Sequence, residues 1–249
     1  MKHRRFLLLS VFLPVVLSPA DSHAMHISEG ILPFSWVLVW YAASAPFLLW
    51  GLRELARRSA VDVASKPLAG MVAAVVFVIS CMPVPVPMAG TCSHPCGTGL
   101  AAVLLGPALG VVVAAVALLI QALFLSHGGL TTWGANLFTM GVMGSFAGYA
   151  AFRGLRSMGA GLTLAAFAAG LIADWATYGG TALIMAAGIR GTSPFWPLFG
   201  KIALAFVPTQ LPLGVLEGAI TAGMVSLLHN KRPDLLARTA LAPRRPEAP

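Results

Sequence analysis

Six long apolar runs, separated by short gaps that hold most of the charged residues, dominate the sequence. They lie at about residues 34–52, 68–84, 99–125, 134–152, 160–187 and 197–228. A helix of about 20 apolar residues crosses the hydrocarbon core of a bilayer, which is about 30 Å thick. Since 58% of the residues are hydrophobic and only 10% are charged, the chain has too little polar surface to cover a soluble globule. The sequence therefore predicts an all-α, polytopic membrane helix bundle.

Basic residues follow the first, fourth and last apolar runs, and the cytoplasmic ends of membrane helices typically carry such residues. The three clusters are Arg53, Arg57, Arg58 and Lys66; Arg153 and Arg156; and Lys231, Arg232, Arg238, Arg244 and Arg245. If each run crossed the membrane once, the second cluster would face outside. The conflict disappears if the run at 99–125 crosses twice, as a short helix that ends near Gly106-Pro107 and a full helix after it, because proline breaks a helix. We therefore predict about seven transmembrane helices, one of them short, which fit every cluster except the isolated Arg190 and Lys201.

The first 24 residues have the pattern of a secretory signal peptide. Its parts are a basic start at Lys2, Arg4 and Arg5, an apolar stretch at 6–17 and a small-x-small cleavage site at Ser22-His23-Ala24. The apolar stretch is too short to span a bilayer. Cleavage after Ala24 gives a signal peptide at 1–24, a transmembrane domain at 25–229 and a disordered cytoplasmic tail at 230–249. We expect a multi-pass protein of the cell inner membrane, with a periplasmic mature N-terminus and a cytoplasmic C-terminus.

The distribution of charge excludes two classes of partner. The formal net charge is +8 at pH 7, but the basic residues sit at the chain ends and between apolar runs rather than on one face, so we expect no nucleic acid partner. No acidic residue occurs between Asp62 and Asp174. A carboxylate-rich calcium or magnesium site is therefore not expected.

Histidines gather on the outer side in this topology. Of the four that remain after cleavage, His26, His94 and His127 lie in outer segments and His229 is cytoplasmic. If Met25 is the first residue, its free amine, the His26 backbone nitrogen and the His26 Nδ1 can close two fused chelate rings around one metal ion. An imidazole from His94 or His127 would complete a roughly planar set of four nitrogens, which suits Ni²⁺ or Cu²⁺. Because the unperturbed pKa of an α-amine is about 8, binding should weaken as the pH falls.

The chain contains, in order, Met25-His26-Ile27-Ser28-Glu29-Gly30-Ile31-Leu32-Pro33, Ser93-His94-Pro95-Cys96-Gly97-Thr98-Gly99-Leu100, Leu105-Gly106-Pro107, Gln121-Ala122-Leu123, His127-Gly128-Gly129-Leu130-Thr131-Thr132 and Gly134-Ala135-Asn136. These stretches resemble those of the CbiM/NikM family, the cobalt and nickel capture (S) components of energy-coupling factor (ECF) transporters. The resemblance covers most of the chain from Met25 to Leu228. The Ser28-Glu29 form of the opening is closer to the cobalt branch than to the nickel branch, which has Pro-Asp there. A planar set of four nitrogens favours nickel, so both metals stay open.

The resemblance implies a metal ion held by the amine of Met25, the backbone and imidazole nitrogens of His26, and the imidazole of His94. It implies a non-enzymatic, substrate-binding subunit without a cofactor, whose transported substrate, Co²⁺ or Ni²⁺, feeds cobalamin biosynthesis. The chain has no G-x-x-x-x-G-K-[ST] motif to hold ATP phosphates, so partners must supply the energy. The implied partners are a CbiQ-like transmembrane coupling subunit, a CbiO-like cytoplasmic ATPase and a CbiN-like small accessory membrane protein.

Several residues near the predicted site have alternative roles. His127 could bind the metal, orient His94 or the N-terminus by a hydrogen bond, or only stabilise its Gly-Gly turn. Asn136 could hydrogen-bond the N-terminal segment or cap its own helix. Cys92 and Cys96 flank His94, where a disulfide could brace the loop or a free thiol could remain, and a thiolate ligand would favour softer metals.

Two acidic residues, Asp174 and Glu217, lie within apolar runs, where an ionisable group is costly and commonly marks a pathway or a buried partner. The sequence favours a structural polar network with Tyr178, Thr181 or Gln210 over proton coupling. The alternative function, a proton-coupled secondary metal transporter, would use one of these carboxyls. A membrane metallohydrolase is disfavoured because the histidines lack an HExxH arrangement.

Overall fold

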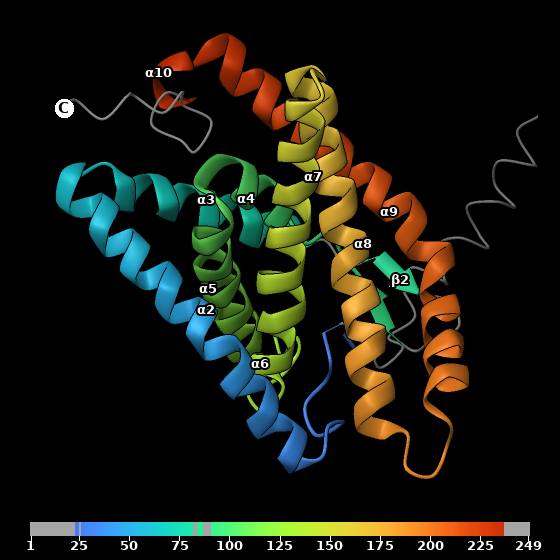
Figure 1. Cartoon of the computed structure of the whole chain (residues 1–249). Coiled ribbons are helices and arrows are strands. Elements are labelled where there is room, and N and C mark those ends of the chain that lie inside the picture. The colour runs from blue at the N-terminus through green and yellow to red at the C-terminus, as the bar shows by residue number, and fades with distance from the viewer. Residues whose placement is uncertain (1–22, 25, 82–83, 87–90, 237–249) are drawn as a thin grey trace, which may run out of the picture.

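A computed structural model describes residues 23–24, 26–81, 84–86 and 91–236 as a bundle of helices (Figure 1). Its helices are α2 (Phe34–Val61), α3 (Ser65–Ser80), α4 (Thr98–Leu105), α5 (Pro107–Phe124), α6 (Trp133–Asn136), the π-helix η1 (Leu137–Gly144), α7 (Ser145–Ser157), α8 (Leu162–Ile189), α9 (Phe195–Lys231) and α10 (Pro233–Leu236). Within these ranges, four helices are long and apolar enough to cross a membrane: α2, α5, α8 and α9. The predicted all-α membrane bundle is confirmed.

The predicted break in the apolar run at 99–125 is present. Helix α4 ends at Leu105 and α5 begins at Pro107, with Gly106 between them at a φ of 90°. Proline lacks a backbone N–H and so fits the first turn of a helix, while glycine tolerates a positive φ. Arg58, near the end of α2, donates from Nη1 to the Leu105 carbonyl oxygen at 2.8 Å and so satisfies the end of α4. All eight residues of α4 are buried, so this short helix lies inside the bundle.

The fourth apolar run forms one helical segment from α6 through η1 to α7. The wider turns of a π-helix often occur near functional sites, and η1 starts directly after Asn136. Helix α9 contains Pro208 and Pro212, each of which removes a backbone hydrogen bond. Figure 1 shows α9 changing direction along its length beside α8.

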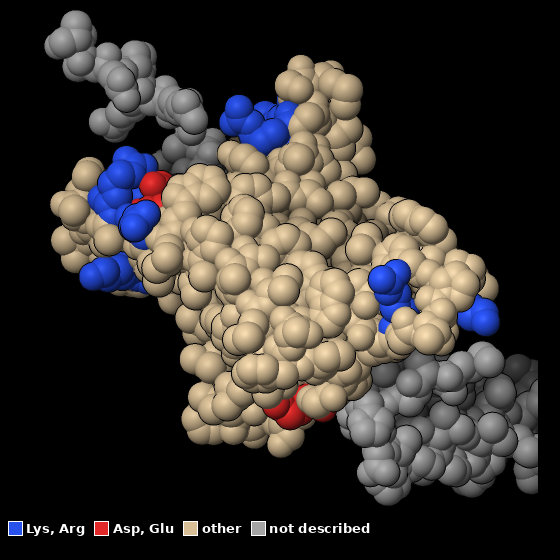
Figure 2. Space-filling view, turned by 60° about the horizontal axis from the view of Figure 1, so that its bottom comes forward, with Lys and Arg blue, Asp and Glu red and all other residues tan. Residues whose placement is uncertain are grey.

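Apolar side chains divide between a buried core and an exposed outer surface. Leu100 and Met140 are among the buried residues, whereas Leu49 and Trp50 on α2 and Leu204 on α9 are exposed. Figure 2 shows a wide uncharged surface, with Lys and Arg side chains gathered near its margins. Such an extensive apolar exterior is typical of helices that contact lipid.

A small three-stranded sheet lies beside the helices, where the sequence indicated only an outer loop. Its strands are β1 (His23–Ala24), β2 (Val84–Val86) and β3 (Thr91–Ser93), in the order β1-β3-β2. Strand β3 pairs in parallel with β1 and antiparallel with β2. Because β3 leads directly into His94, the sheet fixes the start of the segment that carries this residue.

Residues 1–22 of the predicted signal peptide and residues 237–249 of the predicted tail lie outside the described residues, as does Met25, the first residue of the predicted transmembrane domain. Strand β1 belongs to the predicted signal peptide, so cleavage after Ala24 would remove it. At the other end, α9 continues to Lys231 and α10 follows it. The predicted cytoplasmic tail at 230–249 therefore begins with helical residues.

Candidate metal centre

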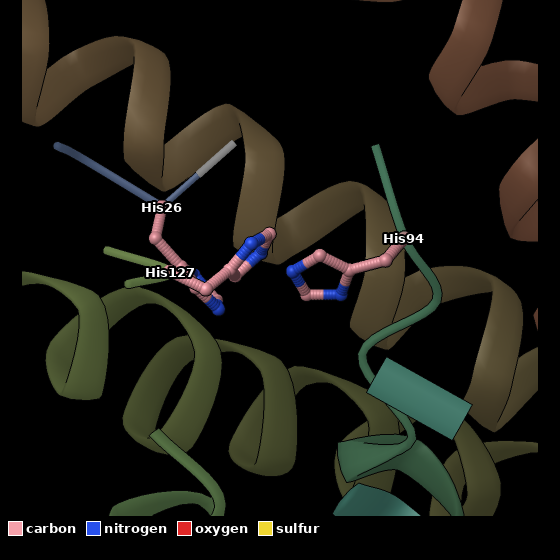
Figure 3. Close-up of side chains that lie close together, drawn as sticks. All are labelled: His26, His94 and His127. Carbon is pink, nitrogen blue, oxygen red and sulfur yellow. The ribbon is translucent and has the colours of Figure 1, made fainter. Parts of the chain in front are cut away.

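Three imidazole rings that are far apart in the sequence meet at one place (Figure 3). The ring centroids of His26 and His94 are 4.7 Å apart, those of His26 and His127 are 4.9 Å apart, and those of His94 and His127 are 5.1 Å apart. One ring nitrogen from each residue lies within 4.8 Å of the other two. His26 precedes α2, His94 follows β3 and His127 follows α5, so three connecting segments build the cluster. The sequence placed these residues on one side of the membrane, and the structure brings them into contact.

A hydrogen bond to Gln121 determines which nitrogen of His26 is free. Gln121 donates from Nε2 to the carbonyl oxygen of Ser80 at 3.1 Å and to its Oγ at 2.9 Å. Its Oε1 is therefore left to accept from His26 Nε2 at 3.0 Å. A neutral histidine that donates from Nε2 carries its lone pair on Nδ1. Nδ1 is the atom that a chelate with the N-terminal amine requires. Gln121, which holds the ring in this way, was not among the residues predicted to act at the site.

The hydrogen bond of His94 leaves its other nitrogen free. His94 Nδ1 donates to the carbonyl oxygen of Pro95 at 3.0 Å, and this oxygen can only accept. The lone pair is therefore on Nε2, which is buried without a hydrogen-bond partner in the described part of the chain. Histidines that bind metals commonly donate their second ring N–H to a carbonyl group in this way. His127 Nε2 is also buried and unpartnered among these residues.

Burial keeps the three imidazoles uncharged at neutral pH. It is the main cause of the low pKa of each ring, because charging a ring in an apolar site is costly. Burial, helped by the neighbouring His127, lowers the pKa of His94 from 6.5 to about 4. The pKa of His26 lies well below its usual value for the same reason, helped by His94 and His127. Neutral imidazoles can accept a metal ion without first losing a proton.

Asn136 and Thr132 hold the backbone next to His26. The N–H of Ile27 donates to Asn136 Oδ1 at 2.8 Å, and Asn136 Nδ2 donates to the Ile27 carbonyl oxygen at 3.2 Å. The Thr132 hydroxyl donates to the same carbonyl oxygen. Both backbone groups of one residue are thus bound, which fixes the position of the residue before it. Of the two roles considered for Asn136, the structure shows hydrogen bonding to the N-terminal segment.

The two glycines after His127 allow its loop to lie against the N-terminal segment. Gly128 has a φ of 79°, and a Cβ there would lie 3.0 Å from the Cβ of His26. A Cβ at Gly129 would lie 1.9 Å from a carboxylate oxygen of Glu29. Glu29 also accepts the backbone N–H of Thr131, at 3.1 Å from Oε2. The Gly-Gly pair therefore permits the contact between His127 and His26.

Side chains of α8 and α9 hydrogen-bond the segment that carries His94. Tyr178 donates from its hydroxyl to the His94 carbonyl oxygen at 2.7 Å, and Gln210 donates from Nε2 to Ser93 Oγ at 2.6 Å. Glu217 accepts the N–H groups of Cys96 and Gly97. Tyr178 and Gln210, predicted to form a polar network with Asp174 or Glu217, thus bond the segment that carries His94. Thr181 donates to a carbonyl of its own helix.

Cys96 is a free, buried cysteine in this structure. Of the alternatives considered for this residue, the structure shows the free thiol. Cys96 lies close to Asp174 and Glu217 rather than in the histidine cluster.

Together these features define an integral membrane helix bundle with a buried cluster of neutral imidazole donors, a set that suits a divalent transition-metal ion. The chain belongs to the CbiM family, described as the cobalt uptake substrate-specific transmembrane region, which matches residues 26–235.

Similar proteins and structures agree with this assignment. The cobalt transport protein CbiM of Geobacter sulfurreducens is 64% identical over 229 residues, which are 92% of this chain and 66% of that protein. The chain thus spans about two thirds of the length of this relative. The cobalt transport protein CbiM of Sorangium cellulosum is 57% identical over 214 residues, 86% of this chain and 95% of that protein. A crystal structure of a truncated transition-metal transporter is 29% identical with a TM-score of 0.74, covering 83% of this chain and 99% of that one.

Proposed function

We propose that this protein is the metal-binding subunit of an ATP-driven importer of the energy-coupling factor type, and that it takes up Co²⁺ or Ni²⁺ from the periplasm. The observation that carries the proposal is His94 Nε2, a buried nitrogen that has no hydrogen-bond partner among the described residues and belongs to a ring 4.7 Å from that of His26. In this proposal the metal ion is the transported substrate, and the subunit itself catalyses no reaction.

The proposed ligands are the amine of Met25, the backbone nitrogen and Nδ1 of His26, and Nε2 of His94. Met25 lies outside the described residues, but consecutive Cα atoms are about 3.8 Å apart. The amine created by cleavage after Ala24 would therefore lie beside His26, whose position is fixed through Ile27. His127 and Asn136 would orient this set, the first through its ring next to both imidazoles and the second through its bonds to Ile27.

The arrangement of the bundle supports the proposed orientation in the inner membrane. The ends of α2, α7 and α9 that carry basic clusters lie at the top of Figure 1, whereas the start of α2, α6 and the connection from α8 to α9 lie at the bottom. Cytoplasmic loops are rich in Lys and Arg. The top would therefore be cytoplasmic, where the proposed CbiO-like ATPase would act through a CbiQ-like coupling subunit, with a CbiN-like protein as a further membrane partner.

The names of the relatives favour cobalt, because the proteins of Geobacter sulfurreducens and Sorangium cellulosum are both called cobalt transport proteins. The imported Co²⁺ would then supply cobalamin biosynthesis. The nitrogen set would also bind Ni²⁺, which favours nitrogen ligands in a plane.

Acetylation of the mature terminus tests the proposed chelate directly. An α-amine with a pKa of about 8 reacts selectively near neutral pH because lysine amines have a pKa of about 10.4. An acetylated terminus cannot donate its nitrogen lone pair, so we expect at least about 100-fold weaker binding of Co²⁺ and Ni²⁺. Mass spectrometry of the N-terminal peptide would confirm both the cleavage site and the modification.

The matched control is the same protein loaded with metal before the reagent is added. If the amine is a ligand, the metal protects it, and the loaded protein should remain unmodified at its terminus. Adding one residue before Met25 is a poorer test, because His26 would become third in the chain, where the terminus alone could supply four nitrogens. Unchanged affinity after complete acetylation would contradict the proposed chelate and favour a site made of the three imidazoles.

A further inference from the structure

A second group of potential metal ligands lies between the segment that carries His94 and helices α8 and α9. Cys96 belongs to that segment, Asp174 to α8 and Glu217 to α9. The Cys96 sulfur and one carboxylate oxygen from each acidic residue all lie within 4.8 Å of one another. Their exposed fractions are 1%, 0% and 1% respectively, so water does not solvate these groups.

Asp174 is the member of this group that receives no N–H donor within the described residues. Both of its carboxylate oxygens are buried and accept no N–H group there, and the carboxyl group of Glu217 lies within hydrogen-bond reach. The ion pairs among the described residues involve only the carboxylates of Glu54 and Asp234, so none of them offsets the charge of Asp174. A buried carboxylate is stable only when it is paired, bound to a metal ion or protonated.

Glu217 is already fixed in place and can still bind a cation. Its Oε2 accepts the N–H of Cys96 at 2.6 Å, and its Oε1 accepts the N–H of Gly97 at 2.9 Å. Each carboxylate oxygen has a second lone pair. The two backbone bonds therefore aim this carboxylate at the cluster without using up its capacity to bind a metal ion.

We propose that Cys96, Asp174 and Glu217 form a second binding site for a divalent transition-metal ion, separate from the three histidines. A thiolate and two carboxylates suit Co²⁺ or Zn²⁺ better than Mg²⁺ or Ca²⁺, which prefer oxygen ligands only. Ligands of a four-coordinate ion with bonds of about 2.0–2.3 Å lie about 3.5 Å apart, which is compatible with ligand atoms that all lie within 4.8 Å of one another. The hydroxyl groups of Thr177 and Tyr178 lie beside Cys96. Each already donates its proton to a backbone carbonyl oxygen, of Ala173 and of His94 respectively, but a lone pair on either oxygen could complete the set.

The position of this site suggests its role in uptake, and that part of the inference rests on the proposed function. His94 and Cys96 are two residues apart, yet His94 faces the histidine cluster and Cys96 faces α8 and α9. Tyr178 binds the backbone of His94 and also lines a groove between α8 and α9 with Phe206 and Gln210. An ion released from the histidines would therefore have its next set of ligands on the opposite side of the same short segment.

The test is a Co²⁺ titration of the full mature protein in which Cys81→Ser and Cys92→Ser leave Cys96 as the only thiol, since the chain has three cysteines. We expect two ions per chain and a thiolate-to-cobalt charge-transfer band in the near ultraviolet. Asp174→Asn should weaken the binding that produces this band by at least tenfold, whereas the matched control Asp62→Asn should leave it unchanged. Cys96→Ser should remove the band while retaining one ion per chain.

His94→Ala separates this inference from the proposed function. In that variant we expect the sulfur band to remain while one of the two ions is lost. If His94→Ala changed nothing but the band were present, the histidine site would be contradicted and the second site retained. A single ion per chain without a sulfur band in the parent protein would overturn the second site, and the two carboxyls would then share a proton. This result needs no variant of the cluster, so it stands even if Cys96→Ser fails to fold.

Discussion

Replacing Gln121 with leucine tests whether the orientation of His26 matters for metal binding. Gln121 accepts the N–H of His26 Nε2 and so leaves the lone pair on Nδ1. Leucine has a similar size but no acceptor. In the variant, the ring can place its proton on Nδ1 instead, where it would block the chelate with the N-terminal amine.

The size of the effect follows from the one bond that is lost. A group that orients a metal-bound histidine contributes about 10–100-fold to affinity, which corresponds to about 1.4–2.7 kcal/mol. A buried N–H without an acceptor costs about 1–3 kcal/mol, which is the same range. We therefore expect the Kd for Co²⁺ or Ni²⁺ to rise by about 10–100-fold in Gln121→Leu.

Isothermal titration of the detergent-solubilised mature protein, with competition by a chelator, would measure this change. Ser80→Ala is the matched control, because it removes the bond from Gln121 to Ser80 Oγ but keeps those to the Ser80 carbonyl oxygen and to His26. Its Kd should change less than about threefold. If Gln121→Leu bound the metal as tightly as Ser80→Ala, the assignment of Nδ1 as a ligand would be refuted.

Three further results are expected. His94→Ala should weaken metal binding at least about 100-fold, while circular dichroism shows unchanged helix content, and His127→Ala should weaken binding less. Equal metal content in wild type and His94→Ala would contradict the assignment of His94 as a ligand. Asn136→Ala should raise the Kd for the metal by about tenfold, because Ile27 loses both of its bonds to the Asn136 side chain. The control is Thr139→Ala, because the Thr139 hydroxyl donates only to a carbonyl of its own helical segment. In the metal-free protein, the unfolded chain takes up a proton at His94 below its pKa of 6.5 and the folded chain only below about 4. His94 alone should therefore lower the free energy of unfolding by about 3 kcal/mol as the pH drops across this window, and His94→Ala should remove that share of the decline in denaturant titrations.

Local patterns were enough to predict most of the bundle. The lengths of the apolar runs predicted the helices, and the charge distribution together with Gly106-Pro107 predicted that α4 and α5 are separate. The three-stranded sheet could not be predicted in this way. Its strands have two or three residues each, which is too short for an alternating pattern, and β1 pairs with a strand far along the chain.

The site was predictable only as far as topology and resemblance reach. The distribution of basic residues placed His26, His94 and His127 on one side of the membrane, and the structure brings their rings together. Gln121 lies in the middle of an apolar run, and its partner His26 is 95 residues away, so no local pattern assigns it a role. The position of Cys96 against Asp174 and Glu217 depends on the packing of α8 and α9, which the sequence leaves open.

The fold determines the protonation of the histidine cluster, and which of its ring nitrogens are free, before any metal binds. Burial lowers the pKa of each imidazole, which reduces competition from protons, and within the described residues it also leaves His94 Nε2 without a hydrogen-bond partner. An unpaired buried acceptor costs about 1–3 kcal/mol, and a bound metal ion would remove this cost. The bonds to Pro95 and Gln121 would then decide which nitrogens face the ion. In the proposed site, selectivity for a nitrogen-binding metal would therefore depend on these two acceptors, neither of which would touch the ion, as well as on the histidines themselves.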